Sequence, residues 1–515
     1  MFRTSTIALL IFLSGCSQKT DQKESPEPRL GVVEMQVTGS PEALPRFERG
    51  LLLLHSFEYK DAEEEFRAAR KADPQMPMAL WGIAMCQNFP IWLHENYDIG
   101  RAAIDSLDLI NREVSEQEQD LIDAVKLIFA EDLEKQERDN NYRDAMARLH
   151  KKYPNHDEVA AFYALSILGT VKEARDYETY GKAAAVAKTV IDRSPKHPGA
   201  LHYYIHACDD PIHAHKALDE AHAYAKTAPS AAHALHMPSH IFLPLGLWDD
   251  LIASNIDAWN ASHERRERKN LENSALDFHS FHWLQYGYLQ NGQVDTAAAM
   301  ALRMAAYTDS LPAKRARKHL AYMQATYCAE TGDFLGPIAE IDVDLTGIDI
   351  VTRAQRHWVQ GMRAFRQNEL SELQAARAVI EKDCRLESLF LDTADFKICI
   401  DLDREMPRQI DIDRSKIMAL QLHAHEAILT GHLAEAEKRL REASDFECSL
   451  DLSYGPQIRK PSPELYADWL LEQGRTDEAI GYYEKSLERA PGRRLPTEAL
   501  KSLGGSEPAT PSAQL

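Results

Sequence analysis

Two near-copies of one short helical sequence constrain the fold of this chain more than any other feature. The first copy begins at Leu201 and reads LHYYIH, and the second begins thirty-four residues later at Leu235 and reads LHMPSH. Residues four apart lie on one face of a helix, so each copy presents two histidines in one direction. A fixed offset of this size is typical of stacked helical hairpins, in which equivalent positions lie side by side. We therefore expect the histidines of both copies to converge on one surface.

A proline interrupts the second copy. Proline is tolerated in the first turn of a helix, so Pro238 predicts a helix that begins near Met237, with His240 inside it and His236 just before it. The two histidine pairs are then expected to lie close together without being superimposable.

The same hairpin pattern recurs towards both ends of the chain. Near the beginning, small residues and a final proline follow the spacing of closely packed helix pairs, at Gly50, Ala62, Phe66, Ala69 and Pro74. Near the end, the pattern returns at Gly474, Ala479, Tyr483 and Pro491. On these residues the chain resembles the tetratricopeptide repeat (TPR) family. The resemblance implies an all-α fold, a right-handed α-solenoid of TPR-like helical hairpins.

The amino terminus has the features of a lipoprotein signal. One basic residue, Arg3, precedes the apolar run 7–13, which is too short to span a bilayer permanently and ends in LSGC at Cys16. The tetrapeptide resembles a bacterial lipobox, which implies that Cys16 is lipidated and that acyl chains anchor the protein without a transmembrane helix. Ser17 follows, which in Gram-negative lipoproteins implies the outer membrane, facing the periplasm. An ordinary signal peptide with a chance cysteine is the alternative.

These patterns predict how the chain is divided. Residues 17–41 are rich in polar residues and proline and lack helical periodicity, which predicts a flexible tether. The predicted segments are 1–16 (signal peptide and lipobox), 17–41 (tether), 42–155 (N-terminal TPR-like hairpins), 156–310 (central His-rich hairpins), 311–503 (C-terminal hairpins) and 504–515 (disordered tail).

A longer signature narrows the resemblance. The stretches HPGALHYYIHA at 197–207 and HALHMPSHIF at 233–242 resemble those of a group of bacterial envelope-associated TPR proteins. That group has no settled activity, so the resemblance locates a site and does not name a function. Pro244 stands where the group has a basic residue, which puts in doubt any anion contact that such a residue makes.

The charge of the chain limits its partners. A formal net charge of -21 disfavours nucleic acid and any broad attraction to anionic lipid. We therefore expect no nucleic-acid partner, and contact with a membrane through the lipid anchor only.

Histidines dominate the predicted ligand groove. In TPR arrays the first helix of each hairpin lines the concave groove, and its fifth and ninth positions face the ligand. Those positions fall on two histidines in each near-copy, and the following unit turns two more histidines and a tyrosine towards the same groove. This predicts binding of a protein, a peptide or a small polar ligand. The residues concerned are His202, His206, His236, His240, His279, His282 and Tyr286.

The same imidazoles permit a second interpretation, a metal site. Packed helices lie about 8–10 Å apart, and an imidazole with a metal bond near 2 Å covers much of half that gap. Coordination rich in imidazole and free of thiolate suits a divalent transition metal such as zinc, copper, nickel or iron. An open coordination position would activate water, as in a metal-dependent hydrolase or oxidoreductase. The predicted metal ligands are His202, His206, His236 and His240. A third interpretation is a purely structural seam of hydrogen-bonded histidines.

A further contact surface is predicted near the carboxyl end. Lys460 and Glu464 begin the first helix of the last hairpin, and Lys460 would hold a ligand carboxylate there. An ordinary charged helix start explains the same residues. Gln421 and His425 occupy the groove register one unit earlier, which extends the predicted ligand path. The sequence has no Gly-rich phosphate loop, GxSxG, HExxH or CxxC, so it predicts no specific catalytic residue.

Overall fold

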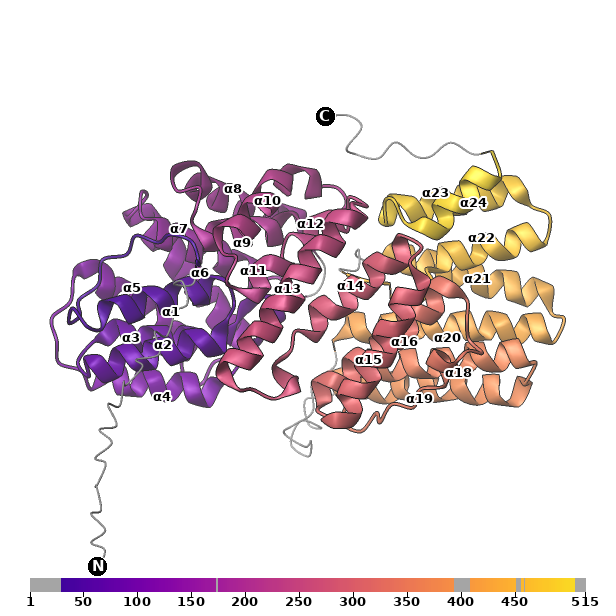
Figure 1. Ribbon diagram of the computed structural model, residues 1–515, viewed down its shortest axis with the longest axis horizontal. Coiled ribbons are helices and arrows are strands. Elements are labelled where there is room, and N and C mark those ends of the chain that lie inside the picture. Colours follow the sequence, from indigo (N-terminus) through magenta and orange to yellow (C-terminus); the bar gives the residue numbers. More distant parts are fainter. Residues whose placement is uncertain (1–28, 173–174, 393–407, 451–454, 458, 505–515) are drawn as a thin grey trace, which may run out of the picture.

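The fold class predicted from the sequence is confirmed. The computed structural model describes residues 29–172, 175–392, 408–450, 455–457 and 459–504. In these residues the chain forms an all-α, right-handed solenoid of TPR-like hairpins, with a single two-stranded ribbon. The hairpins follow one another along the long axis, from the indigo helices to the yellow ones (Figure 1).

The first part of the solenoid runs to the end of the second histidine copy. Its elements are α1 (Leu44–His55), α2 (Tyr59–Ala72), α3 (Pro77–Met85), β1 (Asn88–Phe89), η1 (Pro90–Trp92), β2 (His94–Glu95), α4 (Tyr97–Asp108), α5 (Glu116–Ile128), α6 (Lys135–Lys152), α7 (Asp157–Leu168), α8 (Tyr177–Arg193), α9 (Pro198–Cys208), η2 (Ala214–Ala217), α10 (Leu218–Thr227), α11 (Ala232–His236) and α12 (Ser239–Phe242). The strands β1 and β2 pair antiparallel across η1.

The second part continues to the end of the described chain. Its elements are α13 (Trp248–Lys269), η3 (Asn273–Ala275), α14 (Phe278–Gln290), α15 (Val294–Ser310), α16 (Lys314–Thr331), α17 (Pro337–Glu340), α18 (Ile350–Gln367), α19 (Leu370–Asp392), α20 (Gln409–Leu429), α21 (Leu433–Ser449), α22 (Ser462–Glu472), α23 (Thr476–Arg489) and α24 (Arg494–Ser502).

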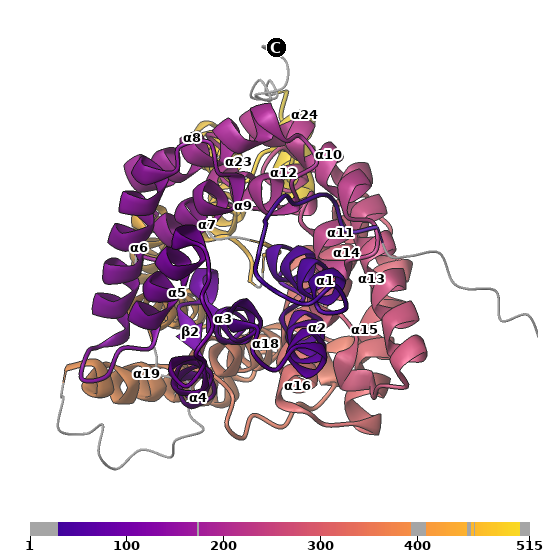
Figure 2. The same ribbon diagram turned by 90° about the vertical axis from the view of Figure 1, so that its left-hand side faces the viewer.

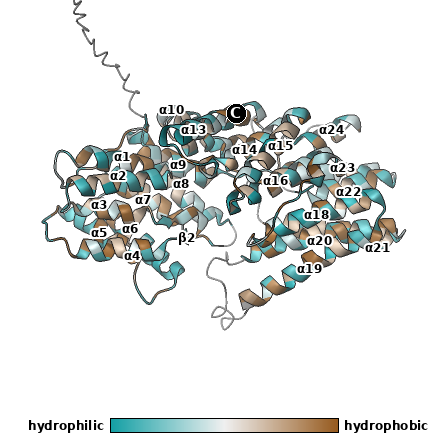
Figure 3. Ribbon diagram, turned by 60° about the horizontal axis from the view of Figure 1, so that its bottom comes forward, coloured by the Kyte–Doolittle hydropathy of each residue, from teal (hydrophilic) through white to brown (hydrophobic). Residues whose placement is uncertain are grey.

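The helices form an inner and an outer layer. In the end-on view, α7, α9 and α11 lie on the inner side, and α6, α8, α10 and α13 lie outside them (Figure 2). Most helices carry both hydrophilic and hydrophobic residues (Figure 3), as expected for helices with one face in the core. The inner helix α9 is buried along its whole length, and α1 contacts it from inside the curve of the superhelix.

Local sequence explains where α9 begins. Pro198 occupies its first turn, where the missing N–H costs nothing. The Nδ1 atom of His197, at the N-cap, accepts the backbone N–H of Ala200 at 3.1 Å. Gly199 permits the close approach of α1, because a Cβ atom there would lie 2.2 Å from Nδ1 of His55. These residues hold the histidine-bearing face of α9 against α1.

The second histidine copy is split at the proline. α12 begins at Ser239, within two residues of the expected start near Met237, and it contains His240 as expected. His236, which was expected just before that helix, is the last residue of a separate short helix, α11. Met237 and Pro238 keep helical dihedral angles, although proline cannot donate a backbone hydrogen bond. The chain therefore keeps its direction, and His236 and His240 remain on one face.

The amino-terminal coil is part of the folded body from residue 29 onwards. Leu30 and Val33 are buried, and the N–H of Val32 donates to the carbonyl of Lys196 at 3.0 Å. The segment 29–40, assigned from the sequence to a flexible tether, is therefore packed onto the solenoid. Cys16 and residues 505–515 lie outside the described residues.

The carboxyl end folds back onto the middle of the chain. Gly246 and Gly492 both have positive φ and their Cα atoms face each other, so a Cβ on Gly246 would lie 2.8 Å from the carbonyl of Pro491. The indole N–H of Trp248 donates to the carbonyl of Gly492 at 2.8 Å. The loop before α24 is thus joined to the turn before α13. No helix among the described residues is long and apolar enough to cross a membrane.

Candidate metal centre

Two groups of three histidines lie side by side on the inner helices. In each group, one ring nitrogen per residue lies within 4.8 Å of the others. Helix α9 contributes two of these residues, α11 two, and α12 and α14 one each. The first triad is His202, His206 and His233, and the second triad is His236, His240 and His279.

Hydrogen bonds fix the tautomers of the second triad. Nδ1 of His236 lies 2.7 Å from Oδ1 of Asn255. The Asn255 amide nitrogen donates to the carbonyl of Leu251 at 2.8 Å, which fixes the orientation of this amide. Nδ1 of His240 lies 3.2 Å from a carboxylate oxygen of Asp209. Both partners are acceptors, so both Nδ1 atoms carry the proton and both Nε2 atoms carry a lone pair.

The two lone pairs of the second triad face each other. Nε2 of His236 lies 3.2 Å from Nε2 of His240. Two neutral imidazoles with these tautomers cannot form a hydrogen bond there, because neither Nε2 has a proton to donate. Either a proton or a cation must lie between them, or the contact is repulsive.

Burial disfavours a proton between the Nε2 atoms of His236 and His240. His236 is fully buried, and its burial together with the nearby His240 lowers the pKa of His236 to about 4. Protonation between the rings is therefore unfavourable at neutral pH. A metal ion fits the same gap, since two nitrogens held about 2.0–2.1 Å from one tetrahedral ion lie roughly 3.3 Å apart.

The first triad presents lone pairs in the same way. Nδ1 of His202 donates to the backbone carbonyl of His55 at 2.7 Å, which leaves its Nε2 unprotonated. That Nε2 lies 3.2 Å from Nε2 of His233. His206 has its Nδ1 at 3.5 Å from Asp209, and its buried Nε2 has no hydrogen-bond partner among the described residues. His233 can donate to one of these nitrogens, so at least one lone pair stays unsatisfied.

Asp209 links the two triads. One of its oxygens faces His206 of the first triad and His240 of the second, and the other accepts from Arg175 at 2.7 Å. Although burial alone would raise the pKa of Asp209, Arg175 and the two histidines lower it well below its usual range. The residue is thus a carboxylate that orients one imidazole of each triad, the arrangement found behind histidines that bind metal.

A third histidine cluster has no unprotonated ring nitrogens that face each other. Glu158 accepts from Nε2 of His55 at 2.6 Å and from Nε2 of His197 at 3.1 Å. Nδ1 of His55 then accepts the hydroxyl of Tyr203 at 2.9 Å, and Nδ1 of His197 accepts the N–H of Ala200. Every ring nitrogen has a partner of the right kind, so this buried cluster is a closed hydrogen-bond network.

The two triads are partly shielded from solvent. His202 and His236 are fully buried, whereas His233, His240 and His279 are partly exposed. Phe57 covers the first triad, with its ring centroid 4.2 Å from that of His202. Phe57 has a φ of 55°, an unusual conformation for a bulky residue and one that is common near functional sites. An ion in the triads would therefore be sheltered and still within reach of water.

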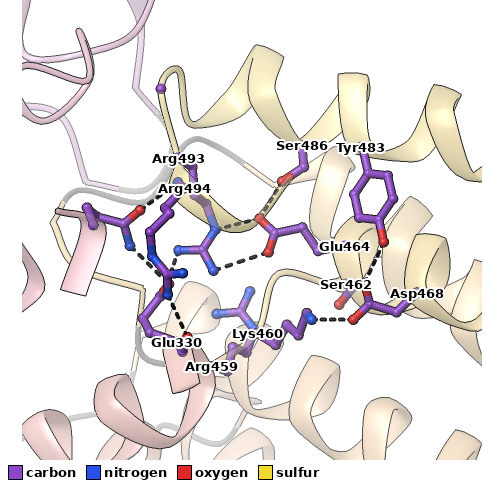
Figure 4. Close-up of polar contacts among 12 residues, drawn as sticks. Glu330, Arg459, Lys460, Ser462, Glu464, Asp468, Tyr483, Ser486, Arg493 and Arg494 are labelled. Atoms are coloured by element: carbon purple, nitrogen blue, oxygen red, sulfur yellow. Dashed lines mark hydrogen bonds and ion pairs between the residues drawn. The ribbon is translucent and has the colours of Figure 1, made fainter. Parts of the chain in front are cut away.

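The other predicted site residues lie outside the triads. Nε2 of His282 donates to the hydroxyl of Thr326 at 2.8 Å, since that hydroxyl itself donates to the carbonyl of Gln457. Arg493 donates to the Tyr286 hydroxyl at 3.1 Å. It also donates to Glu464 at 3.2 Å (Figure 4). Both are buried in this network, which leaves neither free to contact a ligand in an open groove.

Lys460 is placed differently from Glu464. It forms an ion pair with Asp468, which also accepts the hydroxyl of Tyr483 at 2.7 Å (Figure 4). Lys460 also lines a pocket among the C-terminal hairpins. The ligand contact predicted for Lys460 stays a prediction.

Sequence reasoning missed part of the centre. His233 lies on α11 and belongs to the first triad, whose other two residues lie on α9. The available signal was the three-residue spacing of His233 and His236, which also keeps residues on one helix face. Asn255 has no local signal, since it reaches His236 from α13.

Comparisons with known proteins assign no family. No family model and no curated protein match the sequence. A structure of a human IFIT1 dimer with m7Gppp-AAAA has 11% identity and a TM-score of 0.34, and the match covers 92% of this chain and 82% of that one. Yeast Tom70 has 11% identity and a TM-score of 0.32, covering 90% and 88%. The TPR domain of P58(IPK) has 13% identity and a TM-score of 0.22, covering 90% and 97%. Similarity this weak assigns no function.

Proposed function

We propose that this protein is an envelope-anchored TPR-like lipoprotein that binds divalent transition-metal ions in the two histidine triads. The observation that carries the proposal is the 3.2 Å contact between Nε2 of His236 and Nε2 of His240, whose Nδ1 partners Asn255 and Asp209 leave both Nε2 atoms without a proton. The unpartnered Nε2 of His206 supports the same conclusion for the first triad. A structural seam of histidines would instead satisfy each ring nitrogen, as the cluster around Glu158 does.

The ligand set limits which metals fit. Neutral imidazole nitrogens without thiolates suit zinc, copper or iron better than calcium or magnesium, which prefer oxygen. Three histidines leave a coordination position for water or a small ligand, and the partial exposure of His240 gives access to it. Metal-dependent hydrolysis or oxidation is the corresponding enzymatic alternative, and it depends on this open position.

Metal analysis of the chain purified without an affinity tag tests the proposal. We expect bound zinc, copper or iron, with up to one ion per triad. His236→Ala should remove the ion of the second triad and His202→Ala that of the first, because each change deletes a ligand. His282→Ala is the matched control, since it removes a buried histidine whose Nε2 is already bonded to Thr326.

The competing outcomes are distinguishable. Loss of metal in the two triad variants but not in the control supports the proposal, and X-ray absorption should then show nitrogen ligands near 2 Å. The proposal is wrong if the protein holds no metal after growth with zinc, copper and iron and binds none when they are added. In that case the triad variants should only lower the melting temperature.

The envelope location rests on the sequence around Cys16. We expect radiolabelled palmitate to be incorporated into the chain in a Gram-negative host and the product to fractionate with outer membranes. Cys16→Ala should abolish the labelling, because the predicted lipobox then has no cysteine. Unchanged labelling in this variant would place the lipid elsewhere and contradict the predicted lipobox.

A further inference from the structure

The two histidine triads are neighbours, and five of their imidazoles form a closed ring. The centroids of adjacent imidazoles in it are between 4.9 and 6.2 Å apart. Two sides of this ring are the Nε2–Nε2 contacts of 3.2 Å, one in each triad. In order, the ring runs through His202, His233, His236, His240 and His206. We call these five residues the histidine ring.

Each Nε2–Nε2 contact marks the position of one ion, and the two positions are close together. On one side, the contacts are separated only by the step from His233 to His236, whose centroids lie 6.2 Å apart. On the other side, the centroids of His206 and His240 lie 5.5 Å apart. With metal–nitrogen bonds of about 2 Å, two ions would lie roughly 4 to 7 Å from each other. One small ligand can bond to both ions at such a separation.

A single carboxylate oxygen fixes one imidazole of each triad. Oδ2 of Asp209 lies 3.5 Å from Nδ1 of His206 and 3.2 Å from Nδ1 of His240. The Nε2 atoms of both imidazoles therefore remain for the ions. Because one atom orients both imidazoles, the two triads are parts of one arrangement and not two separate sites.

Two divalent ions would bring more positive charge than the surrounding side chains offset. The donors themselves are neutral imidazoles in their metal-binding form. Asp209 is already paired with Arg175 at 2.7 Å. Glu58 and Asp277 accept backbone N–H groups of the triads, each at 3.2 Å. Two cations this close repel each other strongly in a buried site, where water screens little, so an anion between them would be stabilising.

The dimensions of the histidine ring limit the size of that anion. Adjacent imidazoles with centroids no more than 6.2 Å apart leave room for two ions and for an anion of a few atoms only. Solutes of that size can approach from solvent, because His233 and His240 are partly exposed. Trp92, which is half exposed, lies 6.3 Å from the ring of His233 and narrows the approach on that side.

We propose that the two triads act as one dinuclear metal centre that binds a single small anion between its two ions. At rest the anion is hydroxide, formed when a water molecule bonded to both ions releases one proton to solvent. Other small inorganic anions replace it. The proposal rests on metal binding by the triads, and it adds the requirement that the two ions share one ligand.

Electron paramagnetic resonance of the copper-loaded full chain tests whether the two ions are joined. Two Cu(II) ions that share one anion couple magnetically, so the integrated signal should account for less than about a tenth of the bound copper. His202→Ala and His236→Ala each leave one complete triad, and the signal should then account for all the copper that remains. His282→Ala is the matched control, because it leaves both triads complete, and it should stay coupled.

Azide, an anion of three atoms, probes the position between the ions. An optical titration of the copper-loaded chain should show one azide bound for every two copper ions. Each of the two triad variants should bind azide at least about tenfold more weakly, since only one ion then holds it. Equal azide affinity in the full chain and in the triad variants would overturn the shared ligand.

The remaining outcomes separate this proposal from metal binding as such. Two bound copper ions that give the full signal of isolated ions would overturn the dinuclear centre and leave metal binding by the triads in place. Fewer than two copper ions per chain would overturn the dinuclear centre as well. The zinc and iron contents of the purified chain then decide separately whether the triads bind metal at all.

Discussion

Replacing Arg493 with methionine is expected to lower the free energy of unfolding by about 3 to 5 kcal/mol, the cost of breaking one side of a buried ion pair. Arg493 is fully buried and pairs with two buried carboxylates, Glu330 and Glu464 (Figure 4). Without it, two negative charges remain close together with no solvent to screen them. Denaturant unfolding followed by circular dichroism measures the loss.

A triple variant distinguishes the contribution of the Arg493 charge to stability from that of its packing contacts. Changing Arg493 to Met together with Glu330→Gln and Glu464→Gln removes all three charges and should recover most of the lost stability, since a neutral set needs no counterion. Arg475→Ala is the control, because Arg475 pairs with Glu437 and Glu478 at the exposed surface, and it should change stability little. No recovery in the triple variant would show that the contacts of the arginine side chain, and not its charge, hold this end of the chain.

Replacing Asp209 with asparagine is expected to weaken metal binding about 10- to 100-fold at both triads. Asparagine keeps the size of the side chain but loses the charge that holds the protons on Nδ1 of His206 and His240. Metal competition with a chromophoric chelator measures the affinity of each site. An effect on both sites is expected because Asp209 contacts one histidine of each triad.

The neighbouring aspartate provides the control for this experiment. Asp210 is also buried and also pairs with Arg175, but its other partner is His213, which belongs to neither triad. Asp210→Asn should therefore leave metal affinity close to that of the unaltered chain. Equal losses in the two variants would show that Arg175 and general folding, not the orientation of the triad histidines, cause the effect.

The sequence predicted the architecture because its signals are local. Small residues such as Gly50 recur where helices approach closely, and the ring of Phe66 fills the space beside Gly50 and Gly82. Such pairings depend on residues within one hairpin or its neighbour, which is the range that a repeat pattern describes. The packing of residues 29–40 was missed because this coil has no helical periodicity, and the N–H of Val32 pairs with the carbonyl of Lys196, which is distant in the sequence.

The candidate site was predictable only in part. The four-residue spacing placed His202 with His206, and the repeat placed His236 and His240 beside them. The same logic assigned Tyr286 to the groove, but a buried arginine 207 residues away in the sequence determines its surroundings. Helical and repeat spacings describe only residues that are close in the sequence, so they cannot predict this contact. Tautomers also lie beyond the sequence, because they depend on acceptors such as Asn255 that arrive from another helix.

The contact between Gly246 and Gly492 should change the order in which the repeats unfold. A linear array of repeats frays from its ends, since the last hairpin is held by one neighbour only. Here the final hairpin is also attached to the turn before α13, through Trp248 and the Arg493 network. Amide protons of α22 and α23 should then exchange with deuterium almost as slowly as those of interior helices. We therefore expect the last hairpin to unfold together with the interior repeats. We also expect it to resist proteolysis as well as they do.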